Sequence, residues 1–376
     1  MPTHLLPITF LLSLSAFGLR SLHLFAISNG FLIHLEKCIT NGTTPGGKPL
    51  RTLTTNGRWP KLDLQLRAVA VFLLIFCEDM QHADADVVGF SFAANWGASW
   101  ILIVLEGLRA YSRPRFMSWT MIPGILIFNQ SNAVFTPLYL AARLAVASPS
   151  ISAPSLLVSP LDLDLIPWSF LLAYVIPLVA MAMPCLLIKG FNTKHVIASW
   201  YQQWNVYIAL IHTLLAWTWI ASGYDQNSSD ATMEDFLGRL RPVYTFTMVF
   251  AGASLWIPVI ISALAMFSGR RSQQRLDIKH IFVPPSPWSK VKCRSAFEGG
   301  KWLLQWDGII GSSASAVWAL SLFNESRAML APDLPLKTIL EKIALYLVMG
   351  GPMAVATGFL WERDALVLSG NSGSLV

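Results

Sequence analysis

Residues 242–267 read PVYTFTMVFAGASLWIPVIISALAMF and contain no charged side chain. A helix needs about 20 consecutive apolar residues to cross the hydrocarbon core of a bilayer, and this segment exceeds that length. It therefore predicts a transmembrane helix and indicates that the chain is an integral membrane protein.

The composition of the whole chain agrees with this interpretation. Its 376 residues are 54% hydrophobic and only 13% charged, with a mean hydropathy of +0.52. Soluble domains carry roughly 25% charged residues. The net charge of +6 does not indicate a nucleic-acid-binding protein, because the basic residues lie between apolar segments and not along one face or helix.

Further apolar segments of similar length occur along the chain. The predicted spans are residues 5–33, 62–80, 87–108, 117–143, 167–188, 197–221, 242–267, 300–322 and 338–360. Because no internal repeat or low-complexity tract is present, we expect a single integral membrane domain over residues 1–376. The predicted fold class is all-α, a polytopic transmembrane helical bundle with about nine spans.

Basic residues alternate between the two sides of this predicted bundle. Most of the 27 Lys and Arg residues fall in the loops after the first, third, fifth and seventh spans and in the C-terminal tail. Cytoplasmic loops are enriched in Lys and Arg. We therefore expect a multi-pass protein of the endoplasmic reticulum with a cytoplasmic C-terminus and a lumenal N-terminus. The basic loop 268–299 is then cytoplasmic, near anionic lipid, and the glycosylation sequons at Asn227 and Asn324 are lumenal.

Asp307 is the most informative charged residue, because it lies within a predicted span. A charged side chain in the bilayer core costs roughly 3 kcal/mol or more, so such residues are usually functional. Desolvation favours the neutral carboxylic acid, which can donate a proton. Gly308 and Gly311 leave space beside it, and Trp302 and Trp306 share one face of the helix. The alternative is an aspartate that pairs with a neighbouring helix for structural reasons.

Three more carboxylates are candidate partners of this acid. Glu106 lies in the cytoplasmic third of its span, as Asp307 does, so the two could share a site. Arg109, three residues further on, offers Glu106 a simple salt bridge instead. Glu78 and Asp79 stand at the lumenal end of the second span, where they either face a cavity or form a solvated helix end.

Uncharged polar and aromatic side chains inside the spans predict a cavity between helices. Polar groups cannot face lipid unpaired, so they must contact one another or a substrate. Aromatic rings attract a positive charge over their faces and could line a pocket for a carbocation. The candidate substrate contacts are Asn129, Asn132, Gln202, Asn205, Trp200, Trp204, Trp302 and Trp306. Helix–helix packing and an interfacial aromatic belt are the alternatives.

Several classes of site are missing from the sequence. It contains no HExxH zinc helix, no P-loop, no GxSxG nucleophile elbow and no dinucleotide-binding fingerprint. Its four cysteines form no CxxC pair, so neither a metal knuckle nor a disulfide framework is indicated. We expect no metal and no cofactor, which leaves acid chemistry on an apolar molecule, or transport.

Three short motifs carry a resemblance to a known family. They are Gly57-Arg58-Trp59-Pro60 before the second span, Cys77-Glu78-Asp79-Met80 at its end, and Gln305-Trp306-Asp307-Gly308 late in the chain. Together with the chain length, they make the sequence similar to the fungal membrane-bound terpene cyclases of meroterpenoid pathways. That group makes ascochlorin-, ascofuranone- and macrophorin-type compounds. The resemblance covers most of residues 50–365.

The resemblance implies a specific reaction. Such enzymes cyclise a farnesyl chain attached to a phenol or cyclohexenoid head group, and protonation of a terminal epoxide or alkene starts the reaction. Loss of a proton, or migration of hydride or methyl, ends it without a metal or redox cofactor. The resemblance assigns the acid to Asp307, with Glu106, Glu78 or Asp79 as its partner. It also implies a prenylated small molecule and membrane lipid as binding partners, with no particular oligomeric state.

Two other functions stay open at this stage. A multi-pass transporter or lipid carrier would have the same composition, although the commonest carrier architectures contain an inverted repeat and this sequence does not. A membrane acyltransferase needs a catalytic histidine beside an acidic or Asn partner. His212 has no obvious partner of that kind in the sequence.

Overall fold

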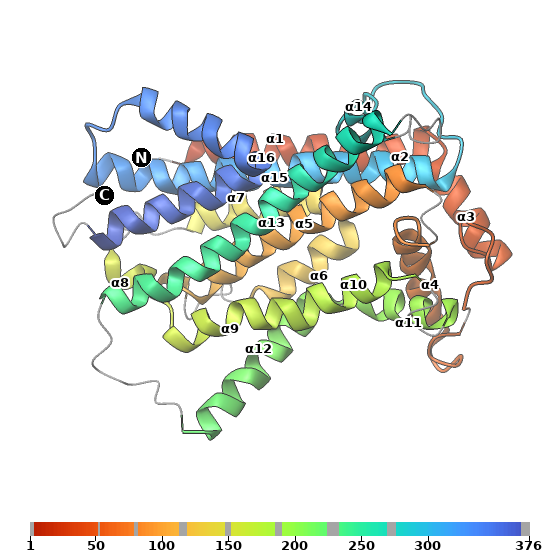
Figure 1. Ribbon diagram of the computed structural model, residues 1–376, viewed down its shortest axis with the longest axis horizontal. Coiled ribbons are helices and arrows are strands. Elements are labelled where there is room, and N and C mark those ends of the chain that lie inside the picture. The colour runs from red at the N-terminus through yellow and green to blue at the C-terminus, as the bar shows by residue number, and fades with distance from the viewer. Residues whose placement is uncertain are drawn as a thin grey trace.

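The computed structural model describes residues 4–51, 53–78, 82–112, 119–146, 152–184, 190–223, 233–268 and 276–369. Within these ranges the regular structure is helical, apart from one isolated β-bridge between Thr43 and Pro49. The predicted all-α class is confirmed. The longest helices lie along the longest axis of the molecule (Figure 1).

The helices differ widely in length, and the longest form the body of the bundle. Those of the described residues are α1 (Leu5–Gly18), α2 (Phe25–Ser28), α3 (Phe31–Asn41), α4 (Pro60–Leu74), α5 (Ala83–Leu108), α6 (Met121–Gln130), α7 (Asn132–Val146), α8 (Ala153–Leu156), α9 (Pro160–Phe170), α10 (Ile176–Ala182), α11 (Phe191–Tyr201), α12 (Trp204–Ala221), α13 (Met233–Phe267), α14 (Ile278–Phe282), α15 (Ala296–Leu330) and α16 (Leu336–Ser369). Segments of π-helix join α1 to α2 and α9 to α10, so each pair forms a continuous rod.

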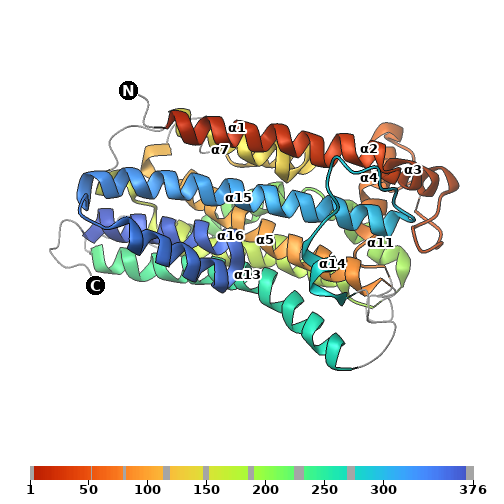
Figure 2. The same ribbon diagram turned by 90° about the horizontal axis from the view of Figure 1, so that it is seen from above.

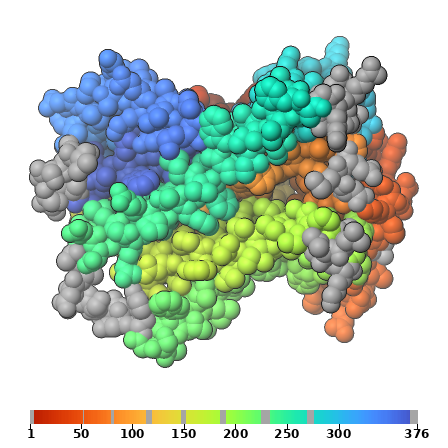
Figure 3. Space-filling view, viewed as in Figure 1, coloured from red at the N-terminus to blue at the C-terminus, as the bar shows by residue number. Residues whose placement is uncertain are grey.

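Side-by-side packing of the long helices creates the core. Figure 2 shows α1 next to α15, and α15 also packs against α5, which in turn packs against α13. In the space-filling view, α13 and α9 lie beside each other across one face of the molecule (Figure 3). Large apolar side chains stay exposed on these rods, with Phe267 89% and Leu6 83% exposed. Such exposure is compatible with a lipid-facing surface.

Six helical segments of the described residues are long and apolar enough to cross a membrane. They are Leu5–Ser28, Ala83–Leu108, Ala153–Ala182, Trp204–Ala221, Met233–Phe267 and Leu336–Leu368. This number supports a multi-pass protein but is smaller than the nine predicted spans. The predicted span 300–322, which lies within α15, is not among the six. The predicted second span is reduced to α4, whose 15 residues are too few to cross a bilayer.

The predicted span 117–143 is not one helix. Ser131 separates α6 from α7, and its φ of 138° and ψ of 152° lie outside the helical region. The amide and hydroxyl side chains of Gln130, Ser131 and Asn132 form a short polar stretch at this break. As a result, the N-terminus of α7 lies inside the protein, where its unpaired backbone N–H groups need acceptors.

The predicted span 338–360 is also not one crossing, because α16 folds back on itself. Gly350 and Gly351 have non-helical backbone angles, and Gly351, at φ 68° and ψ −160°, occupies a region open almost only to glycine. Lys342 Nζ lies 2.7 Å from Glu362 Oε2. A straight helix would separate residues at that spacing by about 30 Å. The two halves of α16 therefore form a helical hairpin.

These two breaks change the predicted topology. Lys301, near the start of α15, pairs with Asp84, near the start of α5, at 2.6 Å. Ser99 and Ser315 meet further along the same two helices at 3.0 Å. The helices α5 and α15 are thus parallel, whereas the charge pattern predicted them to be antiparallel. Both ends of the chain lie at one end of the bundle (Figure 1), whereas the charge pattern predicted them on opposite sides of the membrane.

The two predicted sequons have different outcomes. Asn324 lies within α15 and not in a loop, although its side chain is exposed. Asn227 lies outside the described residues. Glycosylation of either site stays a prediction.

The turn of α16 yields a stability prediction. Gly351→Ala forces an L-residue into the backbone region described above, so we expect it to lower the free energy of unfolding by about 1–3 kcal/mol. The control is Gly238→Ala, because Gly238 lies in exposed helix with no atom near its added Cβ. Alanine there should be neutral or stabilising by up to about 1 kcal/mol. Thermal unfolding in detergent measures both variants, and equal midpoints would contradict the hairpin.

Candidate functional site

A cavity of about 850 Å³ lies between the N-terminal rod, α4, α5, α6, α10, α11 and α15. Small-molecule sites are usually concave, mostly apolar and 300–1,000 Å³ in volume. The walls of this cavity are mainly aromatic and aliphatic, with a few polar groups. The aromatic lining residues are Phe31, Phe72, Phe76, Phe90, Phe92, Trp96, Phe128, Tyr174 and Tyr201.

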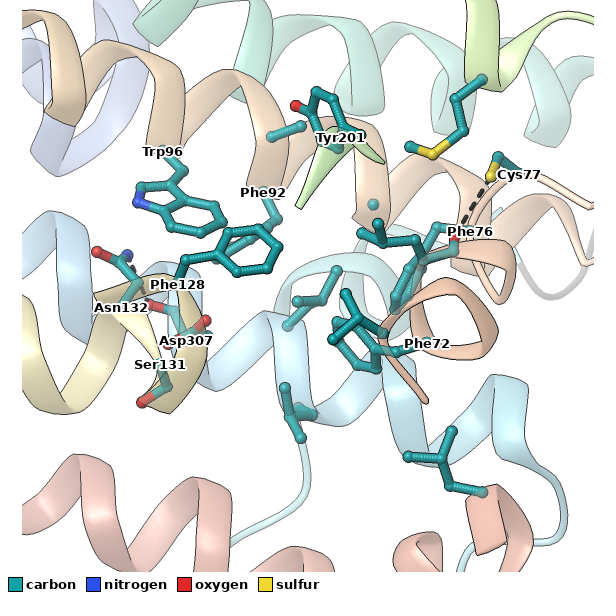
Figure 4. A pocket seen from close by; sticks show the side chains of 18 of the residues that line it. Phe72, Phe76, Cys77, Phe92, Trp96, Phe128, Ser131, Asn132, Tyr201 and Asp307 are labelled. Carbon is teal, nitrogen blue, oxygen red and sulfur yellow. Dashed lines mark hydrogen bonds between the residues drawn. The ribbon is translucent and has the colours of Figure 1, made fainter. Parts of the chain in front are cut away.

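Asp307 faces this cavity from α15 and is 5% exposed (Figure 4). Its Oδ1 accepts a hydrogen bond from the backbone N–H of Ala133 at 2.5 Å, and Asn132 Nδ2 donates to the Asp307 backbone carbonyl at 3.4 Å. These two donors belong to the first turn of α7. The backbone N–H of Asn132 lies close to the same carboxyl group. No side chain of the described residues donates a hydrogen bond to the other carboxyl oxygen, Oδ2. The carboxyl group is therefore fixed in place through Oδ1, while Oδ2 can contact a molecule in the cavity.

The aromatic wall nearest this carboxyl group is built around Trp96 of α5. Its ring stacks on Phe128 at 5.5 Å with an interplanar angle of 17°, and lies 5.3 Å from Phe92. Behind it, Trp204 makes an edge contact at 5.2 Å and 88°. These contacts restrict the rotation of Trp96, so its indole presents a fixed surface to the cavity.

The candidate site thus combines a buried carboxyl group with an aromatic cavity. Residues 7–368 match the family model described as the CtvD domain. The chain belongs to the CtvD family. The family resemblance inferred from the three short motifs is thereby confirmed.

Relatives of this chain in the CtvD family come from fungi. The chain is 24% identical to the terpene cyclase verU1 of Penicillium polonicum over 96% of its own length and 95% of the relative's. It is 27% identical to the terpene cyclase ascI of Acremonium egyptiacum over 74% and 71% of the two chains. It is 24% identical to the terpene cyclase janA of Penicillium janthinellum over 83% and 82%. No solved structure matches the chain significantly.

Four of the predicted site residues line the cavity. They are Asp307, Glu78, Asn129 and Asn132. Glu78 is held by the hydroxyl of Thr44 and by the N–H of Gly46, the latter at 2.9 Å. Asn132 and Asn129 lie on either side of the break between α6 and α7. Asp79 lies outside the described residues, so its role stays a prediction.

The predicted tryptophan contacts do not line this cavity. Trp302 stacks on Phe25 at 6.1 Å and lines a separate cavity, while Trp306 donates to the Pro285 carbonyl at 3.0 Å. Both point away from Asp307, because side chains one and five residues earlier on a helix face other directions around its axis. Trp200 is 53% exposed. Trp204 is buried behind Trp96, one layer from the cavity.

Gln202 and Asn205 are buried but stand behind the lining as well. Gln202 donates to the Ser199 carbonyl at 2.6 Å, within its own helical turn. Asn205 packs next to Gly124 of α6. The helix is interrupted between α11 and α12. As a result, Asn205 faces α6 and Gln202 faces back onto α11. The spacing of polar residues in the sequence did not reveal this interruption.

Glu106 does not share a site with Asp307. It is fully buried in a cluster with Arg109 at 2.7 Å, Arg363 at 2.7 Å and the hydroxyl of Tyr111 at 2.6 Å. Asp307 is level with Phe92, since Gly308 lies next to that ring. Glu106 is therefore about 20 Å further along α5, at 1.5 Å per residue. The alternative interpretation, in which Arg109 neutralises Glu106, is correct.

The same cluster anchors the second half of α16. Asp364 accepts hydrogen bonds from Arg109 and from Arg363, the latter at 2.6 Å, and from Tyr244 at 2.5 Å. Buried charges are costly unless each one has a partner, and here every carboxylate has at least two. The cluster thus joins α5, α13 and α16 and has a structural role.

The sequence of α5 contains a further signal for residues that line the cavity. Asp86, Gly89, Ala93 and Trp96 all line the cavity from α5. Their spacing of three, four and three residues places them on one face of a helix. This face combines a carboxylate, two small residues and an indole. Such a combination indicates a ligand-binding surface more strongly than it indicates helix packing.

His212 has an acidic partner that the sequence did not reveal. Its Nε2 lies 3.2 Å from Asp162 Oδ1, and its Nδ1 lies 3.4 Å from Ser169 Oγ. None of these three residues lines the cavity, and Ser169 is fully buried. The arrangement joins α9 to α12, so it does not favour an acyltransferase.

The structural role of the cluster around Glu106 yields a prediction. Glu106→Gln leaves buried guanidinium groups short of a charge partner, which should cost about 3–5 kcal/mol of unfolding free energy. Turnover per folded molecule should not change. The control is Glu341→Gln, because the Lys337–Glu341 pair is exposed and such pairs contribute at most about 1 kcal/mol. Unfolding in detergent and turnover are measured together, and normal stability with reduced turnover would overturn the structural assignment.

Proposed function

We propose that this chain is a membrane-bound terpene cyclase of fungal meroterpenoid biosynthesis. In this proposal it protonates the terminal epoxide or alkene of a farnesylated phenol or cyclohexenoid and guides the resulting cation through cyclisation. The observation that carries the proposal is the Asp307 carboxyl group, held at Oδ1 by Ala133 and facing an aromatic cavity of about 850 Å³. The relatives named terpene cyclases support the same reaction class.

The hydrogen-bond pattern of Asp307 suits a general acid. In a neutral carboxylic acid, one oxygen accepts hydrogen bonds and the other carries the proton. The N–H of Ala133 occupies Oδ1, so Oδ2 carries the proton towards the cavity. When the proton moves to the epoxide oxygen, the carbon–oxygen bond breaks and a carbocation forms. The new carboxylate is then stabilised by the N-terminus of α7, where the helix dipole is positive.

The rest of the reaction needs a shaped apolar surface. Internal double bonds capture the cation, and a final proton loss returns one proton for the one that was donated, so substrate and product are isomers. The faces of Trp96, Phe92 and Phe128 stabilise positive charge near Asp307. Apolar walls exclude water, which would otherwise quench the cation early.

A membrane location suits this substrate. A farnesyl chain partitions into the bilayer, and the cavity lies inside a helical bundle with lipid-compatible surfaces. We propose that the whole chain acts as one membrane domain, in the endoplasmic reticulum, with the basic loop 268–299 on the cytoplasmic side. Of the three predicted partner carboxylates, Glu78 is the one among the described residues that lines the cavity with Asp307.

The central prediction concerns the acid. Asp307→Asn keeps an acceptor for the Ala133 N–H but has no proton to donate, so turnover should fall by about 10²–10⁴-fold. The control is Asp63→Asn. Asp63 is also buried and accepts backbone hydrogen bonds, from Thr55 at 2.6 Å and Gly57 at 3.1 Å, but it lies outside the cavity. Its variant should keep normal turnover per folded molecule.

The measurement uses microsomes that contain the protein and a farnesylated phenol with a terminal epoxide. Mass spectrometry detects a product of unchanged mass and new retention time, normalised to folded protein. Disappearance of substrate without an isomer would favour a transporter. Retention of more than roughly a tenth of the normal rate in Asp307→Asn would move the proton source to another group.

A second prediction tests the aromatic wall. Cation–π contacts contribute about 0.5–2 kcal/mol, so Trp96→Leu should lower turnover by about two- to thirtyfold. The fraction of products that have captured water should rise. Trp306→Leu is the control, because Trp306 packs outside the cavity. Equal product distributions for the two variants would show that Trp96 does not contact the cation.

A further inference from the structure

The cavity has two chemically different ends. Asp307 and Asn132 lie at one end, and Cys77 lies at the other, with Phe72, Phe76 and other apolar side chains between them (Figure 4). Along α5 the lining extends from Asp86 to Trp96, which corresponds to about 15 Å of helix. Because the acid occupies one end, the polar groups at the other end need a separate explanation.

Lys194 is the cationic group at the end near Cys77. It extends from α11 into the lining and is only 2% exposed. Its Nζ donates to the backbone carbonyls of Cys77 and, at 3.4 Å, of Glu78. An ammonium group has three donors, and the hydrogen bonds of this one among the described residues go to two backbone carbonyls. A buried cation with only carbonyl partners is costly in an apolar surrounding, so a further acceptor is expected there.

Asp86 offers the complementary group. It lines the same end from α5, and its Oδ2 is buried without a hydrogen-bond partner among the described residues. Its neighbour Asp84 differs, because Asp84 is paired with Lys301 at 2.6 Å and lies outside the cavity. Lys194 interacts electrostatically with Asp86. The end of the cavity therefore presents one unused donor and one unused acceptor.

We propose that Lys194 and Asp86 bind the hydroxylated ring of the substrate and orient its prenyl tail towards Asp307. Lys194 donates to a phenolic or carbonyl oxygen of the ring, and Asp86 accepts from a ring hydroxyl. Tyr201, seven residues after Lys194, lines the cavity from the same face of α11, about 10 Å further along the helix. Lys194 and Asp86 are positioning residues, since the reacting bonds lie at the far end. This inference rests on the proposed cyclase function and names the head group that the site selects.

The experiment compares two substrates with the same terminal epoxide. One is a farnesylated phenol, and the other is farnesyl acetate, which has no ring hydroxyl. Lys194→Met and Asp86→Asn should each raise KM for the phenol about 10- to 100-fold, because hydrogen bonds to charged groups are lost. The kcat for the phenol should change little, because the lost contacts stabilise the bound substrate and its transition state equally. The KM for the acetate should also change little, because the acetate has no ring hydroxyl to lose contacts.

Asp84→Asn is the matched control, because it alters a buried aspartate of the same helix outside the cavity. If Lys194→Met does not fold, Asp86→Asn carries the test alone, since it preserves shape. An unchanged KM for the phenol in Asp86→Asn would overturn the head-group assignment. If Asp307→Asn still abolishes turnover of both substrates in that case, the cyclase function stands and only the head-group site fails. If the unaltered protein forms no isomer from either substrate, the proposed function itself fails.

Discussion

The hydrogen bond from the Ala133 N–H to Asp307 connects the architecture of this protein to its chemistry. A helix that begins inside a bilayer exposes backbone N–H groups that neither water nor lipid can satisfy. The break at Ser131 creates such a helix start, and Asp307 supplies an acceptor for it. The same contact leaves the second carboxyl oxygen directed at the cavity. In the proposed function, the two oxygens of this single side chain meet a structural requirement and a catalytic one.

Charged residues in the bundle divide into two groups by their partners. The cluster around Glu106 is self-neutralising, since its carboxylates and guanidinium groups bind one another and join α5, α13 and α16. Asp86 and Lys194, by contrast, retain unused hydrogen-bonding capacity in the cavity lining. Burial alone does not separate these groups, because all of them are largely removed from solvent. Their hydrogen-bond partners do separate them, and we propose that a substrate supplies the missing partners of Asp86 and Lys194.

Helical hairpins explain why hydropathy overestimates the number of spans. An apolar segment with a Gly-Gly-Pro turn, as in α16, or a short polar break, as at Ser131, has the composition of a crossing but reverses inside the protein. Such irregular backbone is tolerated at membrane depth where protein surrounds it. Each reversal changes the direction of the helices that follow it. The break at Ser131 lies between α5 and α15 in the chain, so it contributes to their parallel arrangement, whereas the turn of α16 affects only the C-terminal end.

The sequence by itself determined the helical fold and the family, and it led to the proposals of a membrane location and of Asp307 as the acid. These depend on local properties: apolar length, short motifs, and the rarity of a carboxylate inside a span. Only the tertiary structure decided that Glu106 belongs to Arg363, that Trp96 and not Trp302 lines the cavity, and that Asp86 and Lys194 share its far end. Glu106 and Arg363 are 257 positions apart in the chain. A partner so distant leaves no local trace, because hydrogen bonds and ion pairs depend on separation in space and not along the chain.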